Sequence, residues 1–76
     1  MHQLAKLRWQ CRRGTKELDF LLLRYLDSRY AQADTQEQAL FVELLALEDD
    51  ALIGVFLGGQ KPEVKELTGL INKITK

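Results

Sequence analysis

The sequence is poor in the residues on which disulfides, metal centres and most active sites depend. Its 76 residues include one cysteine, Cys11, and one histidine, His2. A single cysteine excludes an internal disulfide, and these two residues alone are too few to form a metal site. No nucleophile with a base is visible, nor a phosphate-binding glycine loop, because Gly58 and Gly59 are not followed by Lys-Ser or Lys-Thr. We therefore expect a protein that is not an enzyme and binds no metal.

Long apolar runs are also missing. No stretch reaches the roughly 20 apolar residues that a membrane-spanning helix needs, and the start, Met-His-Gln-Leu-Ala-Lys, lacks the apolar core of a signal peptide. The low cysteine content suits a reducing compartment. We therefore expect a cytoplasmic protein without stable membrane insertion.

The length allows one domain, residues 1–76, with a small core. A chain of this size buries only about 60% of its surface on folding, so it has few residues to spare for an enclosed cofactor pocket. The expected class is a binding module that acts through its surface and holds no cofactor tightly.

Charges balance over the whole chain but not along it. Eleven basic residues oppose eleven acidic ones, and the net charges are +4 for residues 1–29, −6 for residues 30–50 and +2 for residues 51–76. A phosphate backbone needs sustained positive charge, whereas a protein partner can carry complementary patches of both signs. The pattern favours a protein partner and argues against nucleic acid.

Apolar spacing predicts an all-α fold, a compact bundle of five short helices joined by short loops. Strand is the competing interpretation for residues 52–57, but acidic residues before this segment and two glycines after it favour a helix. The helices are expected at about residues 4–11, 15–30, 36–47, 51–57 and from Pro62 to Ile74.

Several residues are expected to begin or end these helices. Gly14, after two arginines, is typical of the left-handed residue that ends a helix, and Thr15 or Gly14 is expected to cap the second helix. Thr35 followed by Gln38 fits a capping box for the third helix. Pro62 suits the first turn of the fifth.

Helical periodicity also predicts which side chains are buried. Gly69 interrupts the fifth helix, and we expect it to mark close packing against a neighbour. The predicted buried stripes are Leu18, Leu21, Leu22, Tyr25 and Leu26 in the second helix, Leu40, Phe41, Leu44 and Leu47 in the third, and Val64, Leu67, Leu70, Ile71 and Ile74 in the fifth.

A mixed polar and apolar patch is the candidate binding surface. If the second helix extends back to Arg13, then Arg13, Glu17, Phe20 and Arg24 lie within about 60° of one another around its axis. Phe20 and Leu23 fall on the polar side, where large apolar side chains need a cover from this protein or a partner. The simpler alternative is that Arg13 and Glu17, four residues apart, only pair with each other.

Cys11 has two possible roles. Neighbouring Arg12 and Arg13 could lower the pKa of its thiol and make it reactive. We favour the alternative, a small buried apolar residue on the first helix.

The stretch from Trp9 to Asp19, Trp-Gln-Cys-Arg-Arg-Gly-Thr-Lys-Glu-Leu-Asp, resembles the signature of the SdhE/YgfY flavinylation factors. These are bacterial relatives of mitochondrial succinate dehydrogenase assembly factor 2, and their core motif Arg-Gly-x-x-Glu matches Arg13, Gly14 and Glu17. The acidic segment 47–50, the glycines before Lys61-Pro62 and the chain length also fit. The family often has a tryptophan in its short fourth helix, where this sequence has Val55 and Phe56.

The resemblance implies a five-helix protein that binds the flavoprotein subunit of succinate dehydrogenase, and of fumarate reductase where present. It also implies that the protein promotes covalent attachment of FAD to a histidine of that subunit, as a chaperone and not as the catalyst. Together with the residue pattern, it gives these candidate partner-binding residues: Trp9, Arg12, Arg13, Gly14, Glu17, Asp19, Phe20 and Arg24.

Two other functions stay open at this point. One is a non-enzymatic interaction module with an unrelated partner, such as the antitoxin of a toxin–antitoxin pair, a name that the resembling family has also carried. The other is a flavin carrier that binds FAD itself. Glu17 could also act electrostatically at the site of flavin attachment.

Overall fold

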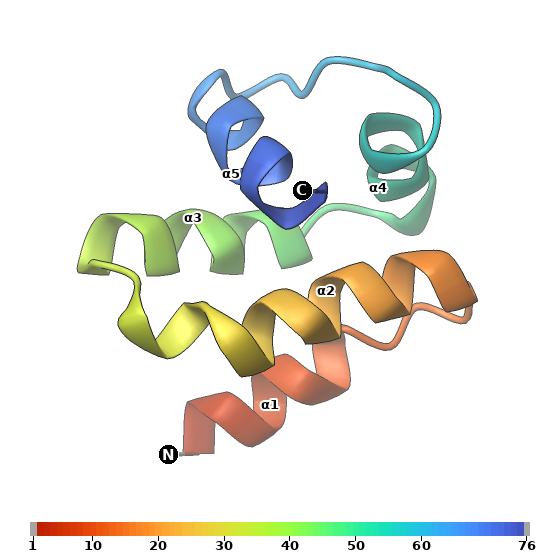
Figure 1. The fold of residues 1–76 in the computed structure, drawn as a ribbon. Coiled ribbons are helices and arrows are strands. Elements are labelled where there is room, and N and C mark those ends of the chain that lie inside the picture. The colour runs from red at the N-terminus through yellow and green to blue at the C-terminus, as the bar shows by residue number, and fades with distance from the viewer. Residues whose placement is uncertain (1, 76) are drawn as a thin grey trace.

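The computed structural model describes residues 2–75, and within them the predicted all-α bundle of five short helices is confirmed (Figure 1). A single-turn 3-10 helix, η1, joins the second and third helices. The elements are α1 (His2–Gln10), α2 (Lys16–Ser28), η1 (Tyr30–Gln32), α3 (Thr35–Leu45), α4 (Asp49–Phe56) and α5 (Glu66–Thr75).

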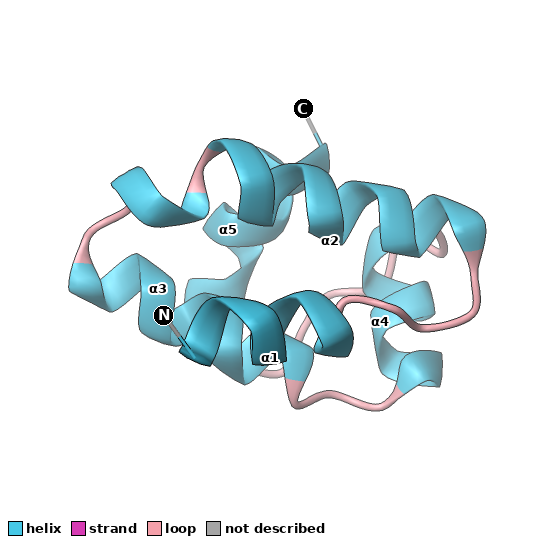
Figure 2. Ribbon diagram, turned by 90° about the horizontal axis from the view of Figure 1, so that it is seen from below, coloured by secondary structure: helices cyan, strands magenta, loops and turns pink. Residues whose placement is uncertain are grey.

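The five helices enclose one core. α1 packs against both α2 and α3, and Figure 2, which shows the molecule from below, has α1 in front, beside α2 and over α3. α5 contacts α2 and α3 on the other side, and α4 packs against α2 and α5. None of the helices in residues 2–75 is long and apolar enough to cross a membrane.

The predicted buried faces form most of this core. Leu18, Leu22, Tyr25 and Leu26 of α2 are buried as predicted. The other predicted positions Leu21, Leu40 and Leu47 are only half-buried. The Tyr25 ring centroid lies 4.8 Å from that of Phe41, a separation typical of favourable aromatic packing. The remaining buried apolar residues are Leu7, Cys11, Tyr30, Leu44, Leu45, Leu52, Leu67, Leu70, Ile71 and Ile74.

The start of α3 differs from the prediction. The N-cap is Asp34 and not Thr35, because an Asp34 carboxylate oxygen accepts a hydrogen bond from the backbone N–H of Glu37 at 2.8 Å. Gln38 makes no capping box and instead donates its side-chain amide to the carbonyl of Tyr30 at 2.8 Å. Aspartate is the stronger cap, and moving the cap back by one residue lets Gln38 tie η1 to α3.

α4 is helical as favoured, and its bounds are Asp49–Phe56 instead of 51–57. Gly59 follows with a φ of 72°, which is left-handed, and the backbone N–H of Gln60 donates to the carbonyl of Gly54 at 2.9 Å. The glycine stop is therefore confirmed, since only a residue tolerant of positive φ closes this turn without strain.

The prediction for the start of α5 is wrong. The helix begins at Glu66, and Pro62 lies in the long connection that leads from α4 to α5 (Figure 1). Those residues are needed to cross between the two helices, so Val64 is not in the buried stripe and is 42% exposed. Gly69 does not mark close packing either, because a Cβ placed there would meet no atom within 4 Å.

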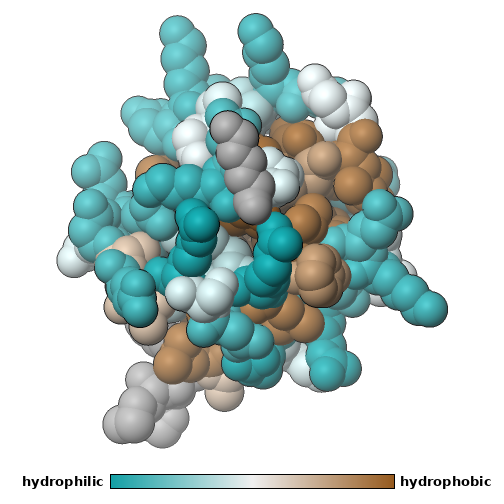
Figure 3. All heavy atoms as spheres, in the orientation of Figure 1, coloured by the Kyte–Doolittle hydropathy of each residue, from teal (hydrophilic) through white to brown (hydrophobic). Residues whose placement is uncertain are grey.

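Some apolar side chains reach the surface. Leu57 and Val64, next to α4 and in the following connection, are 44% and 42% exposed, and Figure 3 shows apolar side chains at the surface beside α4. Leu23 packs against the core and is half-buried, whereas Phe20 is 61% exposed. Both residues were expected to need a cover. The fold covers Leu23 and leaves Phe20 exposed.

Candidate protein-interaction site

The loop between α1 and α2, residues 11–15, makes a turn that depends on glycine. Gly14 has a φ of 85°, and no atom lies within 4 Å of the position where a Cβ would be. The prediction that Gly14 ends α1 is wrong, because that helix stops at Gln10. Gly14 instead redirects the chain into α2, whose N-cap is Thr15, one of the two expected residues. The result is an exposed stretch of backbone without a side chain.

Arg13 fastens this loop to a distant part of the fold. Its guanidinium group donates to the backbone carbonyl of Leu45 at the end of α3 and lies 3.3 Å from a carboxylate oxygen of Asp49 in α4. Its side chain is only 17% exposed. Its backbone N–H donates to Oδ1 of Asp19 at 2.6 Å, which holds the loop against the first turns of α2. Arg13 therefore sits outside α2, and its side chain points toward α3 and α4.

This arrangement excludes the simple pairing of Arg13 with Glu17, since the Arg13 side chain is engaged elsewhere. It also removes Arg13 from the helical patch, because the helical wheel applies only from Lys16 onward. The partners Leu45 and Asp49 were missed from the sequence. The acidic residues at the start of α4 indicated only a helix cap. Nothing in the neighbouring sequence links Asp49 to Arg13, 36 residues earlier.

Glu17, Phe20 and Arg24 lie along one side of α2, and we call them the α2 stripe. All three are exposed. The guanidinium carbon of Arg24 lies 5.4 Å from the centre of the Phe20 ring, and Arg24 also donates to the carbonyl of Ile74 at 2.9 Å. These contacts hold Phe20 and Arg24 together on the surface, where aromatic and arginine side chains commonly dominate protein binding.

The other candidate residues differ in exposure. Trp9 on α1 is 75% exposed, and Arg12 in the loop is exposed as well. Asp19 is half-buried and points its carboxylate at the backbone of Arg13. The structure therefore brings Arg13 and Asp19 together as supports of the loop, and leaves Trp9, Arg12, Gly14 and the α2 stripe accessible.

Cys11 is a core residue. Its side chain is fully buried, and burial raises the pKa of the thiol to about 11 despite nearby Arg13 and Arg8. A thiol with so high a pKa holds little thiolate at neutral pH, so the reactive alternative is excluded and the interpretation as a buried apolar residue is confirmed.

The described residues offer little chemistry of their own. Within residues 2–75 no three His, Cys, Asp or Glu side chains gather in a way that could hold a metal ion. Glu17 and Asp19 point in different directions, one exposed and one toward Arg13, so they do not form an acid–base pair. The candidate site is therefore an exposed surface, and the contacts of Arg13 and Asp19 hold its loop in place.

Comparisons with known proteins identify the family of this chain. A family model described as "flavinator of succinate dehydrogenase" matches residues 5–76. The chain is 38% identical to the FAD assembly factor SdhE of Colwellia psychrerythraea over 72 residues, which cover 95% of this chain and 79% of the relative.

Two further relatives carry the same name. The protein of Methylococcus capsulatus is 39% identical over 74 residues, covering 97% of this chain and 89% of the relative. That of Coxiella burnetii is 39% identical over 69 residues, covering 91% and 84%. A comparison with the solved structures gave no significant match. The match over nearly the whole chain shows that this protein belongs to the family of FAD assembly factors described as flavinators of succinate dehydrogenase.

Proposed function

We propose that this protein binds the flavoprotein subunit of succinate dehydrogenase and promotes the covalent attachment of FAD to it. The observation that carries the proposal is the match of residues 5–76 to the flavinator family, together with relatives named FAD assembly factors. The Arg-Gly-x-x-Glu residues that carried the resemblance lie in one loop and the first turn of α2, with Gly14 and Glu17 exposed.

The proposed contact surface consists of Trp9, Arg12, Gly14 and the α2 stripe. Because Gly14 has no side chain and open space around it, the partner's backbone can approach the loop closely there. Phe20 supplies an exposed aromatic anchor, and Arg24 and Glu17 supply charges on either side of it along the helix. Arg13 and Asp19 act indirectly, by holding the loop that presents these groups.

The protein acts as a chaperone and not as a catalyst in this proposal. Its contact surface has no paired acid and base, so its contribution is the free energy of binding. Such binding promotes flavin attachment only if the surface contacts the competent conformation of the flavoprotein better than other conformations. FAD itself is not held tightly by this protein, and Glu17 acts through the partner.

Two finer points belong to the same proposal. The flavoprotein of fumarate reductase is a second partner where an organism has it, as the family resemblance implies. The protein acts in the cytoplasm, which agrees with its single, reduced and buried cysteine.

The proposal is tested by deleting the protein in its host and separating the flavoprotein on a denaturing gel. Fluorescence of covalently bound flavin in the flavoprotein band is expected to fall, while the amount of flavoprotein stays the same. Re-expression of the protein restores the signal. Unchanged flavin fluorescence in the deletion strain would refute the proposal. Free FAD titrated against the purified protein separately tests the expectation that it is not a flavin carrier.

A further inference from the structure

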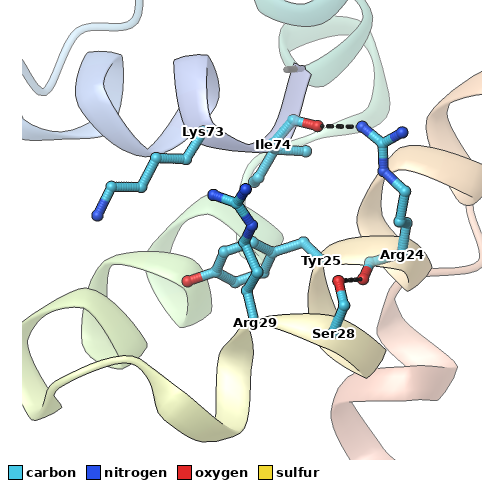
Figure 4. A pocket seen from close by; sticks show the side chains of 6 residues that line it. All are labelled: Arg24, Tyr25, Ser28, Arg29, Lys73 and Ile74. Carbon is cyan, nitrogen blue, oxygen red and sulfur yellow. Dashed lines mark hydrogen bonds between the residues drawn. The ribbon is translucent and has the colours of Figure 1, made fainter.

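A cavity near the C-terminal end of α2 is lined by three cationic side chains. Arg24 and Arg29 come from the end of α2 and the residue after it, and Lys73 comes from the last turn of α5 (Figure 4). The cavity has a volume of about 230 Å³, and Tyr25, Ser28 and Ile74 complete its wall. None of these lining residues, all within the described part of the chain, carries a carboxylate.

Arg24 is held in place by two contacts that leave donors available. One nitrogen, Nη2, donates to the carbonyl of Ile74 at 2.9 Å, and the guanidinium group lies over the ring of Phe20. Its other N–H groups make no hydrogen bond to residues 2–75. A guanidinium group fixed in this way loses little conformational entropy when it binds an anion.

Arg29 has no hydrogen bond or ion pair with any side chain of residues 2–75. Figure 4 shows its guanidinium group above the cavity, between Lys73 and Ile74. Asp34 and Glu37 line a neighbouring pocket together with Arg29, and Glu37 is engaged by Lys73 at 2.6 Å and by the Tyr25 hydroxyl at 2.5 Å. Arg29 therefore has acidic neighbours, but within the described residues its guanidinium group forms no ion pair with them.

Helix polarity explains why each of these cations is favoured singly, but not why all three meet at one cavity. α2 and α5 both end beside the cavity, and cations are favoured at the negative end of a helix. This accounts for Arg24, which donates to the carbonyl of Ile74 near the end of α5, and Lys73 has its own partner in Glu37. It also favours Arg29, the C-cap residue of α2, but it gives no reason for Arg29 to lie beside two like charges, where it forms no ion pair within residues 2–75.

We propose that this cavity binds a small phosphate-class anion, held by the guanidinium groups of Arg24 and Arg29, with Lys73 at the edge of the site and still paired with Glu37. Planar guanidinium groups match the oxygens of phosphate with paired, charge-assisted hydrogen bonds. Ser28 adds no donor, because its hydroxyl donates to the carbonyl of Arg24 at 2.5 Å. The site does not depend on the proposed role in flavin attachment.

The test is an NMR titration of the full-length protein, labelled with ¹⁵N, with inorganic diphosphate. Sodium chloride at matched ionic strength serves as the control for screening. The expected result is a set of saturable shifts confined to the amides of Arg24, Ser28, Arg29 and Lys73. Sodium chloride should not reproduce these shifts.

Arg29→Gln and Lys65→Gln provide a matched pair of variants, since each removes one positive charge from an exposed position and only Arg29 lines the cavity. Arg29→Gln should weaken diphosphate binding about tenfold or more, the effect of losing one charge-assisted contact. Lys65→Gln should bind like the unmodified protein. Equal binding by both variants, or shifts spread without saturation over all basic residues, would overturn the proposal.

Discussion

The guanidinium group of Arg13 donates a hydrogen bond to the backbone carbonyl of Leu45, 32 residues further along the chain. Through this contact the loop that carries Gly14 is fixed on the end of α3, and the proximity of Asp49 extends the contact to α4. The loop of the proposed contact surface is therefore held in place by α3 and α4, which come later in the sequence.

Replacing Arg13 should destabilise the fold. Arg13→Gln removes the donors to Leu45 and Asp49, and we expect the free energy of unfolding to fall by about 1–3 kcal/mol. Arg12→Gln is the matched control, because Arg12 is exposed, and its effect should stay within about 0.5 kcal/mol. Urea unfolding followed by circular dichroism measures both. The same unfolding midpoint for the two variants would show that the Arg13 contacts contribute nothing.

Two glycines should respond in opposite ways to the same substitution. Gly14→Ala forces a Cβ onto a residue with a φ of 85°, and the expected cost is about 1–2 kcal/mol although nothing clashes. Gly69→Ala lies within α5 in open space and should stabilise the protein by up to about 1 kcal/mol. Thermal unfolding compares the two melting temperatures. A melting temperature for Gly14→Ala at or above the unmodified value would contradict the left-handed turn.

The Glu37 carboxylate should make stability depend on pH in the acidic range. Hydrogen bonds from Lys73 and from the Tyr25 hydroxyl lower the pKa of Glu37 in the folded protein. A lowered pKa means that the folded state holds the proton less tightly than the unfolded state does. The contribution is therefore present above the unfolded pKa of about 4.3 and is lost as the pH falls through the folded value.

Denaturant unfolding between pH 7 and pH 3 measures this loss, and Glu37→Gln should reduce the slope because it removes the titrating group. The contribution of Glu37 is refuted if the variant shows the same pH dependence as the unmodified protein.

Cys11 should react with thiol reagents only after unfolding. Its side chain is fully buried and its pKa is about 11, so both access and thiolate content are low in the folded state. Ellman's reagent at pH 8 should therefore modify the native protein slowly and the protein in denaturant rapidly. Comparable rates in both conditions would mean that α1 does not stay packed on the core.

Local patterns were sufficient for the helices and for most of the core. The buried positions of α2 follow from three-and-four spacing, and Leu67 to Ile74 follow in the same way, because each stripe needs only one helix to be recognised. The prediction was wrong for the connection between α4 and α5. Pro62 suits the first turn of a helix, but here it lies in the connection that spans the distance between the two helices.

The candidate site was only partly predictable for the same reason. The motif indicated Arg13, Gly14 and Glu17 together, and helical spacing added Phe20 and Arg24. The inward direction of the Arg13 side chain could not be predicted from neighbouring residues, because its partners belong to α3 and α4. Asp19 likewise looked like a surface charge of α2, whereas its carboxylate receives the backbone N–H of Arg13. Sequence spacing locates residues on a helix, and only the assembled fold shows which of them support the others.

The most direct test of the central claim compares Glu17→Gln with Glu43→Gln, an equal change at another exposed glutamate, on α3. Each variant is co-expressed with the succinate dehydrogenase flavoprotein in a host that lacks its own assembly factor, and covalent flavin is read by fluorescence on a denaturing gel. We predict that both variants fold, that Glu43→Gln supports full flavin attachment, and that Glu17→Gln loses most of it. Full flavin attachment with Glu17→Gln would contradict the assignment of the loop and the α2 stripe as the surface that acts on the flavoprotein.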